Sequence, residues 1–313
     1  MPLFKIHHIT KYEYDRPVTE NANEIRIFPF QCSEQETLQF ELNITGEPDV
    51  KTFFDYWGNK TGSFSLITPH QILVIESKSV VRTTSPSDPE INFSGTWKDL
   101  ERDKRNNLKL LELSLQEMIN SQDEIDNILK SIYSHDKSVA AFVEELAEYI
   151  FKNFEYIKGL TNIETTIGEI LQHHAGVCQD FVHLMLQMLR TLKIPSRYVS
   201  GYICPNKNGM RGEGATHAWV EVWLPGYGWA GIDPTNNSWI TNTHVKLAIG
   251  RSFHDCSPVK GVFKGPANQR LFVNVSVSYE DGNVFEDINN VKLTEEPSTL
   301  PNQFNLNSIS QQQ

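Results

Sequence analysis

The sequence predicts an α+β fold, in which a β-rich, sandwich-like region at residues 1–95 precedes a core of helices packed on an antiparallel sheet at residues 138–285. Three observations support this prediction. Apolar and polar residues alternate in several runs of the first region, apolar residues recur every three to four positions in two later segments, and short β-branched runs follow those segments. The chain has 313 residues, of which 39% are hydrophobic, so it can form about two domains and is not disordered overall.

The first 95 residues contain several strand signals. Alternation is visible at residues 4–9 and 38–44, and residues 71–81 form a β-branched run. Turn residues separate these runs at positions 45–48 and 57–59, which fits a small antiparallel sandwich or an open barrel. No nucleophile with a nearby base stands out in this region. We therefore expect a separate β-domain that contributes no catalytic residue.

Helices are expected after this region. Residues 96–137 are polar and charged, and they are predicted to connect the two domains with some helix. Ser138 fits the N-cap of an amphipathic helix. The apolar face of that helix consists of Val139, Phe142, Val143, Leu146, Ile150 and Phe154. Thr166 and Glu169 match a capping box, which predicts a short helix that ends near His173.

A further helix is predicted to begin at Cys178. Gly176 can turn the chain, a second apolar periodicity starts immediately afterwards, and Pro195 ends it. The apolar positions are Phe181, Leu184, Met185, Met188, Leu189 and Leu192. The thiol of Cys178 would therefore lie at a helix N-terminus, where the partial positive charge and free N–H groups favour a thiolate. A lone cysteine is more often a small buried hydrophobe, so the thiol needs a base beside it to be a nucleophile.

Such a base is expected where two later strands meet. Strands are predicted at residues 197–203, 217–224, 229–232 and 271–279. His217 opens the second of these strands after a glycine-rich loop, and Asp233 ends the third. If the two strands pair as a hairpin through residues 225–228, the start of one lies beside the end of the other. His217 and Asp233 then become neighbours, although either residue alone could be an incidental polar group at a strand end.

Other histidines compete for a role beside Cys178. His173 and His174 precede this cysteine, and His183 lies on the same helix but is rotated well away from it. None of these histidines has the C-x-x-C or H-E-x-x-H spacing that is typical of zinc sites. We therefore expect neither a metal nor another cofactor.

Charge and cysteine content favour a cytoplasmic protein. The net charge of −11 argues against nucleic acid or an anionic membrane as the main partner. Cys32, Cys204 and Cys256 have no nearby base and no disulfide-framework spacing, so they are interpreted as structural thiols in a reducing compartment. No signal peptide and no apolar run long enough to span a membrane are visible. Residues 286–313 are expected to form a polar C-terminal tail.

Several blocks of the sequence resemble the transglutaminase-like superfamily. The most specific of them are residues 176–181 (GVCQDF), 216–222 (THAWVEV) and 229–235, which ends in Asp233-Pro234-Thr235. Two N-terminal stretches and one C-terminal stretch are similar to the bacterial branch that has an additional N-terminal β-region. They are residues 23–29 (NEIRIFP), 54–59 (FDYWGN) and 250–258 (GRSFHDCSP).

This resemblance implies a papain-like fold and a catalytic triad. Cys178 corresponds to the nucleophile, His217 to the base and Asp233 to the acid that orients the base. Gln179 and Asp180 belong to the motif and are expected to have structural roles. The backbone N–H of Cys178 is expected to bind the oxyanion, and Gln172 stands at the spacing where papain-like enzymes place a side-chain donor.

The implied activity is hydrolysis of an amide or peptide bond in a protein or peptide substrate, as in a cysteine protease or amidase. A thioester acyl-enzyme would form first, and water would then complete the reaction. Two alternatives remain open at this point. An amine could accept the acyl group in place of water, as in a transglutaminase, or the chain could be a non-catalytic binding module.

Overall fold

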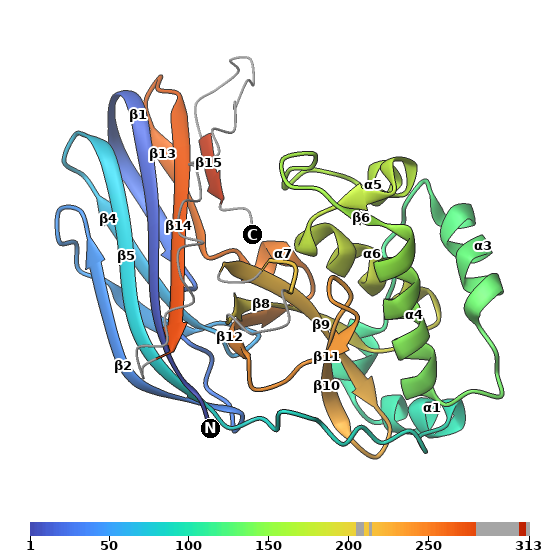
Figure 1. Ribbon diagram of the computed structural model, residues 1–313. Helices are drawn as coiled ribbons and strands as arrows, with labels where there is room; N and C mark the ends of the chain where they lie inside the picture. The colour runs from blue at the N-terminus through green and yellow to red at the C-terminus, as the bar shows by residue number, and fades with distance from the viewer. Residues whose placement is uncertain (205–209, 213–214, 280–306, 311–313) are drawn as a thin grey trace.

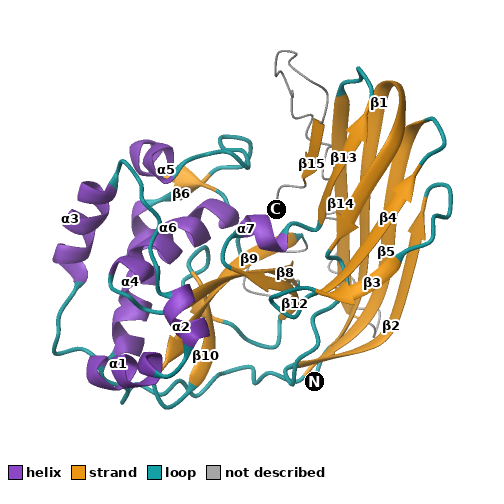
Figure 2. Ribbon diagram, turned by 180° about the vertical axis from the view of Figure 1, so that it is seen from behind, coloured by secondary structure: helices purple, strands orange, loops and turns teal. Residues whose placement is uncertain are grey.

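The computed structural model of the protein describes residues 1–204, 210–212, 215–279 and 307–310. It consists of a large β-sandwich and a mixed part in which helices cover one face of a smaller sheet (Figure 1). The smaller sheet lies between the helices and the sandwich, and the same order of layers is seen from behind (Figure 2).

A single long strand organises the β-sandwich. The N-terminal strands are β1 (Leu3–Ile25), β2 (Gln35–Ile44), β3 (Lys51–Phe54), β4 (Lys60–Leu66) and β5 (His70–Thr83). The first half of β1 pairs with β5, and its second half pairs with β4 after a register shift between Glu13 and Val18. Alternate side chains such as Tyr12, Tyr14 and Ile25 are buried in the sandwich core, which is what a period of two predicts for a sheet buried on one face.

Strands from the far end of the chain complete this sandwich. They are β13 (Val259–Lys264), β14 (Gln269–Tyr279) and β15 (Asn307–Ser310). Both β13 and β14 pair with β1, and β15 pairs with β13. This differs from the sequence-based division, which assigned residues 138–285 to the catalytic core, because a strand's own alternation does not specify which sheet it joins. The rest of the expected tail at 286–313 lies outside the described residues. We call all eight of these strands the β-region.

The helices begin close to the expected positions. The segment 96–137 forms α1 (Trp97–Arg105), α2 (Leu108–Leu113) and α3 (Gln122–Ile132). Then α4 (Val139–Asn153) follows Ser138, whose hydroxyl accepts a hydrogen bond from the backbone N–H of Ala141. The capping box of Thr166 and Glu169 is present at the start of α5 (Ile167–His173). The last helices are α6 (Cys178–Thr191) and α7 (Phe253–Cys256).

The smaller sheet, called the central sheet below, is antiparallel and has five strands. They are β8 (Ser196–Ile203), β9 (Thr216–Leu224), β10 (Gly228–Asp233), β11 (Ser238–Trp239) and β12 (His244–Gly250), in the order β11-β10-β9-β8-β12. Helix α6 packs on β8 and β9, and α4 packs on α6. Apolar side chains of Phe142, Phe181 and Val220 are completely buried between these layers. A short parallel pair, β6 (Glu155–Tyr156) with β7 (Ala175–Gly176), lies beside the start of α6.

Two amide side chains of the β-region bind the backbone of β12. The Gln35 amide donates to the carbonyl of Lys246 and accepts from its N–H, both at 2.8 Å. Asn59 makes the same pair of bonds to Ile249, also at 2.8 Å, and its Nδ2 donates to Asp55 as well. We call these contacts the amide clamps. They give Asn59, in the 54–59 stretch, a structural role, and they attach the β-region to the edge of the central sheet.

None of the helices within the described residues is long and apolar enough to cross a membrane.

Candidate active site

Cys178 occupies the first position of α6, as the sequence predicts. The chain arrives through β7, and Val177 is the extended N-cap residue. The carboxylate of Asp180 accepts a hydrogen bond from the Val177 N–H at 2.7 Å, so it caps the start of the helix. Gly176 is needed at its position because a Cβ there would lie 2.7 Å from the Asp180 carboxylate. The Cys178 side chain is thereby fixed at the positive end of α6, with 2% of its surface exposed.

Asp180 also ties a neighbouring loop to this helix. Its Oδ2 accepts a hydrogen bond from the Thr161 hydroxyl at 2.6 Å. Burial raises the pKa of Asp180, while the hydrogen bonds from Thr161 and Val177 act in the opposite direction. The expected structural role of this motif residue is therefore visible in its contacts.

The β9–β10 hairpin brings His217 and Asp233 together. The two strands pair from Leu224 and Gly228 at the turn to Val220 and Ile232 near the open end. His217 Nε2 lies 2.7 Å from Asp233 Oδ2, and both side chains are fully buried. His217 and Asp233 are therefore neighbours, as the symmetry of the sequence about the turn predicts.

Three donors hold the Asp233 carboxylate. Besides His217, the Thr235 N–H donates to Oδ1 at 2.8 Å and the Asn236 amide donates to Oδ2 at 2.7 Å. Burial alone would raise the pKa of Asp233, but the positive charge and hydrogen bond of His217 hold that pKa well below its usual range. The acid is therefore a carboxylate at all ordinary pH values.

The second ring nitrogen of His217 is buried and remains available for another group. Burial lowers the pKa of His217, but the charges of Asp233 and Cys178 outweigh this and raise it to about 10. Nε2 is bound to Asp233, and within the described residues Nδ1 has no hydrogen-bond partner, so Nδ1 is the atom left for Cys178. The geometry therefore favours an imidazolium between a carboxylate and a thiol group.

The raised pKa of His217 predicts that stability falls at alkaline pH. The pKa of a histidine in an unfolded chain is about 6.5, whereas the pKa of His217 in the folded protein is raised to about 10. The folded protein therefore binds the His217 proton more tightly than the unfolded chain does, and this difference stabilises the fold. The stabilisation is complete below about pH 6.5 and is lost as the pH rises through about 10, at up to about 1.4 kcal/mol per pH unit. Urea unfolding of the parent and of His217→Asn across this interval measures the difference. Parallel pH dependences of the two proteins would contradict the assignment.

His244 is a site residue that the sequence reasoning missed. It opens β12, and its Nε2 lies 3.9 Å from Asp233 Oδ2. Its ring is buried against Trp219 and faces His217 at a centroid distance of 6.2 Å. No local signal could have found it, because its position depends on the pairing of β12 with β8 at the far side of the central sheet.

His217, Asp233 and His244 have the spacing of a possible metal-binding group. One ligand atom from each lies within 4.8 Å of the others. However, Asp233 already accepts hydrogen bonds from His217 and Asn236 at Oδ2 and from Thr235 at Oδ1, so protein donors take three of its roughly four acceptor positions. Hydrogen bonding therefore accounts for the closeness of His217 and Asp233 within this cluster.

The remaining histidines and Gln172 from the sequence analysis lie away from this pair. His174 ends α5 in the left-handed conformation, with φ of 49°, and its side chain is exposed, as are those of Gln172 and His173. His183 accepts a hydrogen bond from the Phe253 N–H at 3.2 Å, and burial lowers its pKa to about 4. These side chains are accounted for by surface exposure or by packing.

The other three cysteines have the environment of structural thiols. Cys204 and Cys256 are fully buried, and burial raises the pKa of each thiol well above its usual value. Cys32 is half-buried, and burial raises its pKa to about 11. All four cysteines are free.

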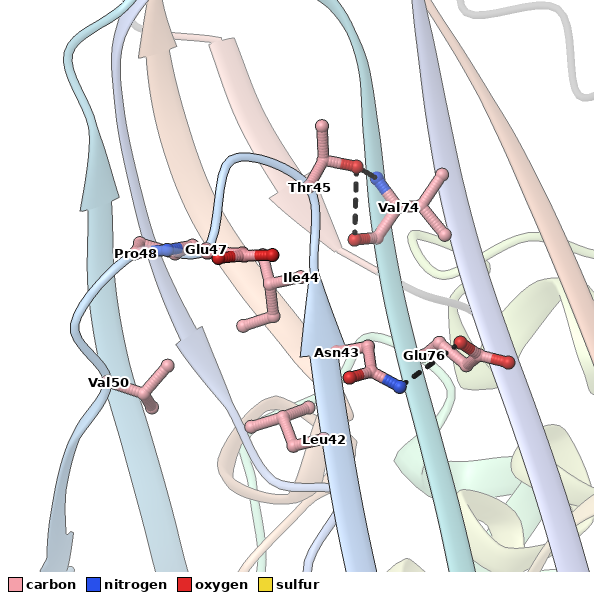
Figure 3. Close-up of a pocket in the computed structure, with 9 residues that line it drawn as sticks. All are labelled: Leu42, Asn43, Ile44, Thr45, Glu47, Pro48, Val50, Val74 and Glu76. Atoms are coloured by element: carbon pink, nitrogen blue, oxygen red, sulfur yellow. Dashed lines mark hydrogen bonds between the residues drawn. The ribbon is translucent and has the colours of Figure 1, made fainter.

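A surface hollow of about 560 Å³ lies on the β-region and not at these residues. Figure 3 shows its lining, which includes Leu42, Ile44, Val50 and the Asn43–Glu76 hydrogen bond. None of the residues that line it is a cysteine, histidine or aspartate, so it offers no pair of nucleophile and base.

Two family profiles match the chain. One describes the transglutaminase-like superfamily and covers residues 126–234, which include Cys178, His217 and Asp233. The other describes the bacterial transglutaminase-like N-terminal region and covers residues 4–82. The N-terminal profile covers the first five strands of the β-region, and the superfamily profile covers the helices around Cys178 and part of the central sheet.

Individual proteins extend this likeness over most of the chain. An uncharacterised protein of Mycobacterium leprae is 32% identical over 281 residues, which are 88% of this chain and 98% of that protein. A shorter match, 38% identical over 66 residues, joins 20% of this chain to 10% of a protein-glutamine gamma-glutamyltransferase of Pseudomonas aeruginosa. The solved structure of a "putative cysteine protease" from Cytophaga hutchinsonii aligns with a TM-score of 0.71 over 99% of this chain and 98% of that one, at 19% identity. The predicted fold class is thereby confirmed.

Proposed function

The chain belongs to the transglutaminase-like superfamily, and from this membership we propose that it is a cysteine-dependent hydrolase of amide or peptide bonds. In this proposal Cys178 is the nucleophile, His217 the proton carrier and Asp233 the group that orients it. One observation supports it above all others: the buried His217 ring is bound to the Asp233 carboxylate at 2.7 Å, and the charges of Asp233 and of Cys178, at the start of α6, raise the pKa of His217.

The first half of the reaction follows from these positions. The Cys178 thiolate attacks the carbonyl carbon, a C–S bond forms, and the π-electron pair moves to oxygen to give an oxyanion. The backbone N–H of Cys178, at the first position of α6, is available to bind that oxyanion. When the oxyanion collapses, the C–N bond breaks, and the Nδ1 proton of His217 goes to the leaving amine. A thioester between Cys178 and the acyl group remains.

The second half regenerates the thiolate. Neutral His217 takes a proton from water as the water oxygen attacks the thioester carbonyl. The C–S bond then breaks and the acid is released. Asp233 stays ionised throughout, since its pKa is held well below the usual range, and it keeps the imidazole ring in the orientation that serves Cys178.

A transfer of the acyl group to an amine is the second candidate function. It shares the first half-reaction and differs only in the nucleophile that attacks the thioester. The local likeness to a protein-glutamine gamma-glutamyltransferase favours keeping this candidate. A glutamine peptide incubated with hydroxylamine distinguishes the two: hydrolysis yields glutamate, whereas transfer yields the hydroxamate.

The proposal includes a protein or peptide as substrate and a cytoplasmic location. An amide or peptide bond in such a chain is the group that the proposed site would cleave. The four free thiols support a reducing compartment, where disulfides do not form.

Alkylation with iodoacetamide near neutral pH tests the proposal on the unaltered protein. Cys178 is expected to react on the order of 10²-fold faster than Cys204 and Cys256, because burial raises the pKa of the latter two, whereas Cys178 lies at a helix N-terminus. Mass spectrometry of the peptides identifies which of the four thiols is modified at each time. A Cys178 that reacts no faster than the two buried thiols would favour the binding-module interpretation over catalysis.

A further inference from the structure

The oxyanion of the proposed reaction needs a second hydrogen-bond donor besides the Cys178 N–H. Papain-like spacing points to Gln172, but that side chain is exposed on α5, before the left-handed turn at His174. We propose that the hydroxyl of Tyr156 is this donor and that Tyr156 is a catalytic residue. This inference rests on the function proposed above, and it concerns a residue that no sequence motif marked.

The backbone places Tyr156 beside the nucleophile. Strand β6 pairs in parallel with β7, and the partner of Tyr156 in this register is Gly176, two residues before Cys178. The Ile157 N–H donates to the Gly176 carbonyl at 3.0 Å, and the Glu155 N–H donates to the His174 carbonyl at 2.8 Å. Tyr156 is therefore held on both sides by the same segment that leads into α6.

Side-chain packing directs the ring toward the site. The Tyr156 ring contacts Phe181 edge-on, with 6.4 Å between the ring centroids. Phe181 lies three residues after Cys178, so both project from the same side of α6. The Tyr156 ring therefore packs against α6, the helix whose first residue is Cys178.

Gly212 locates the Tyr156 hydroxyl relative to His217. A Cβ built on Gly212 would lie 3.0 Å from His217 Nδ1 and 3.6 Å from the Tyr156 hydroxyl oxygen. The hydroxyl and the catalytic nitrogen therefore face the same glycine, and φ of +77° at this residue is one that L side chains rarely adopt. Any larger residue at 212 would occupy the space between them.

The hydroxyl is free to donate. Among the described residues no hydrogen bond engages it, and the ring is only partly exposed. Burial raises the pKa of Tyr156, and the neighbouring charges of Cys178, Asp233 and Asp180 raise it further. The phenol therefore keeps its proton near neutral pH. It donates a hydrogen bond to the oxyanion without transferring a proton, while His217 supplies the proton that the leaving amine receives.

Two probes of the thiol separate this role from other roles of Tyr156. Acylation of Cys178 by 4-nitrophenyl acetate passes through a tetrahedral oxyanion, and 4-nitrophenolate is released as the thioester forms. Alkylation by iodoacetamide displaces iodide from carbon and forms no oxyanion. Tyr156→Phe should slow acylation by about 10²- to 10³-fold, the range for a lost oxyanion donor, and leave alkylation within about twofold of the parent.

Tyr149→Phe is the matched control. Tyr149 lies on α4, its ring packs against the helical core, and burial raises its pKa. This variant should match the parent in both reactions. Thermal unfolding of all three proteins shows whether the ring replacements leave the fold unchanged.

The two reactions test the role of Tyr156 separately from the proposed function. Slower acylation with unchanged alkylation supports Tyr156 as the oxyanion donor. Unchanged acylation in Tyr156→Phe, or an equal loss in both reactions, overturns this role and leaves the proposed function intact. A parent protein in which acetate never reaches Cys178 would overturn the proposed function and the role of Tyr156 with it.

Discussion

Replacing Cys178 with alanine is expected to abolish thioester formation and every turnover that depends on it. Alanine offers no atom that can form the covalent bond, so the loss should reach the background of the assay, whereas removal of a group that only assists leaves measurable activity. Intact-protein mass spectrometry after incubation with 4-nitrophenyl acetate is the direct measurement. The parent should gain one acetyl group on Cys178, and the variant should gain none at that position.

Cys32→Ala is the control for this experiment. Cys32 is the only one of the other three thiols that is not fully buried, so its replacement removes a thiol with little disturbance of packing. It should acylate at the rate of the parent. If Cys178→Ala still formed a thioester at another cysteine and retained turnover, the nucleophile would have been assigned to the wrong residue.

A graded loss is expected when the groups that assist Cys178 are replaced. His217→Ala should lower the acylation rate of an amide substrate by about 10³- to 10⁴-fold, because both the proton donor and the partner of the thiolate are lost. Asp233→Ala should lower it by about 10²- to 10³-fold, because the ring loses its orientation and the charge that stabilises its protonated form. Single-turnover rates with each variant give the order.

Asp233→Asn distinguishes orientation from charge. An asparagine oxygen can still accept the hydrogen bond from His217 Nε2, as Asn does in papain-like proteases, but the negative charge is gone. This variant should therefore retain more activity than Asp233→Ala, and the pKa of His217 should fall from its raised value of about 10. The matched control is Asp103→Asn, since Asp103 also accepts a ring N–H, that of Trp223, but lies on α1. Equal activities of Asp233→Ala and the parent would mean that another acceptor orients His217.

The sequence predicts the parts of this site that depend on interactions between residues close together in the chain. A helix start is set by Gly176, by the capping carboxylate of Asp180 and by the apolar period that follows, so the place of Cys178 could be predicted. The meeting of His217 and Asp233 depends on one short hairpin, whose symmetry about its turn is visible in the sequence.

The parts that escaped prediction depend on pairing between distant segments. Strand β14 joins β1 with Phe4 opposite Tyr279, a contact that spans nearly the whole chain, and alternation alone gives no register for it. His244 reaches Asp233 only because β12 adds to the edge of β8. Tyr156 is held opposite Gly176 by a two-residue parallel pair, which is too short to leave a periodic signal.

The amide clamps have a consequence for self-association. An antiparallel sheet ends in strands whose outward N–H and C=O groups can pair with a strand of another molecule, the first step toward aggregation. On β12 the outward groups of Lys246 and Ile249 are occupied by the amides of Gln35 and Asn59, which imitate a neighbouring strand without being one. At the opposite edge, β11 has only two residues, too few to template a ladder. In the sheet that bears His217 and Asp233, side chains therefore limit intermolecular strand addition at the β12 edge, and the short length of β11 limits it where β11 forms the other edge.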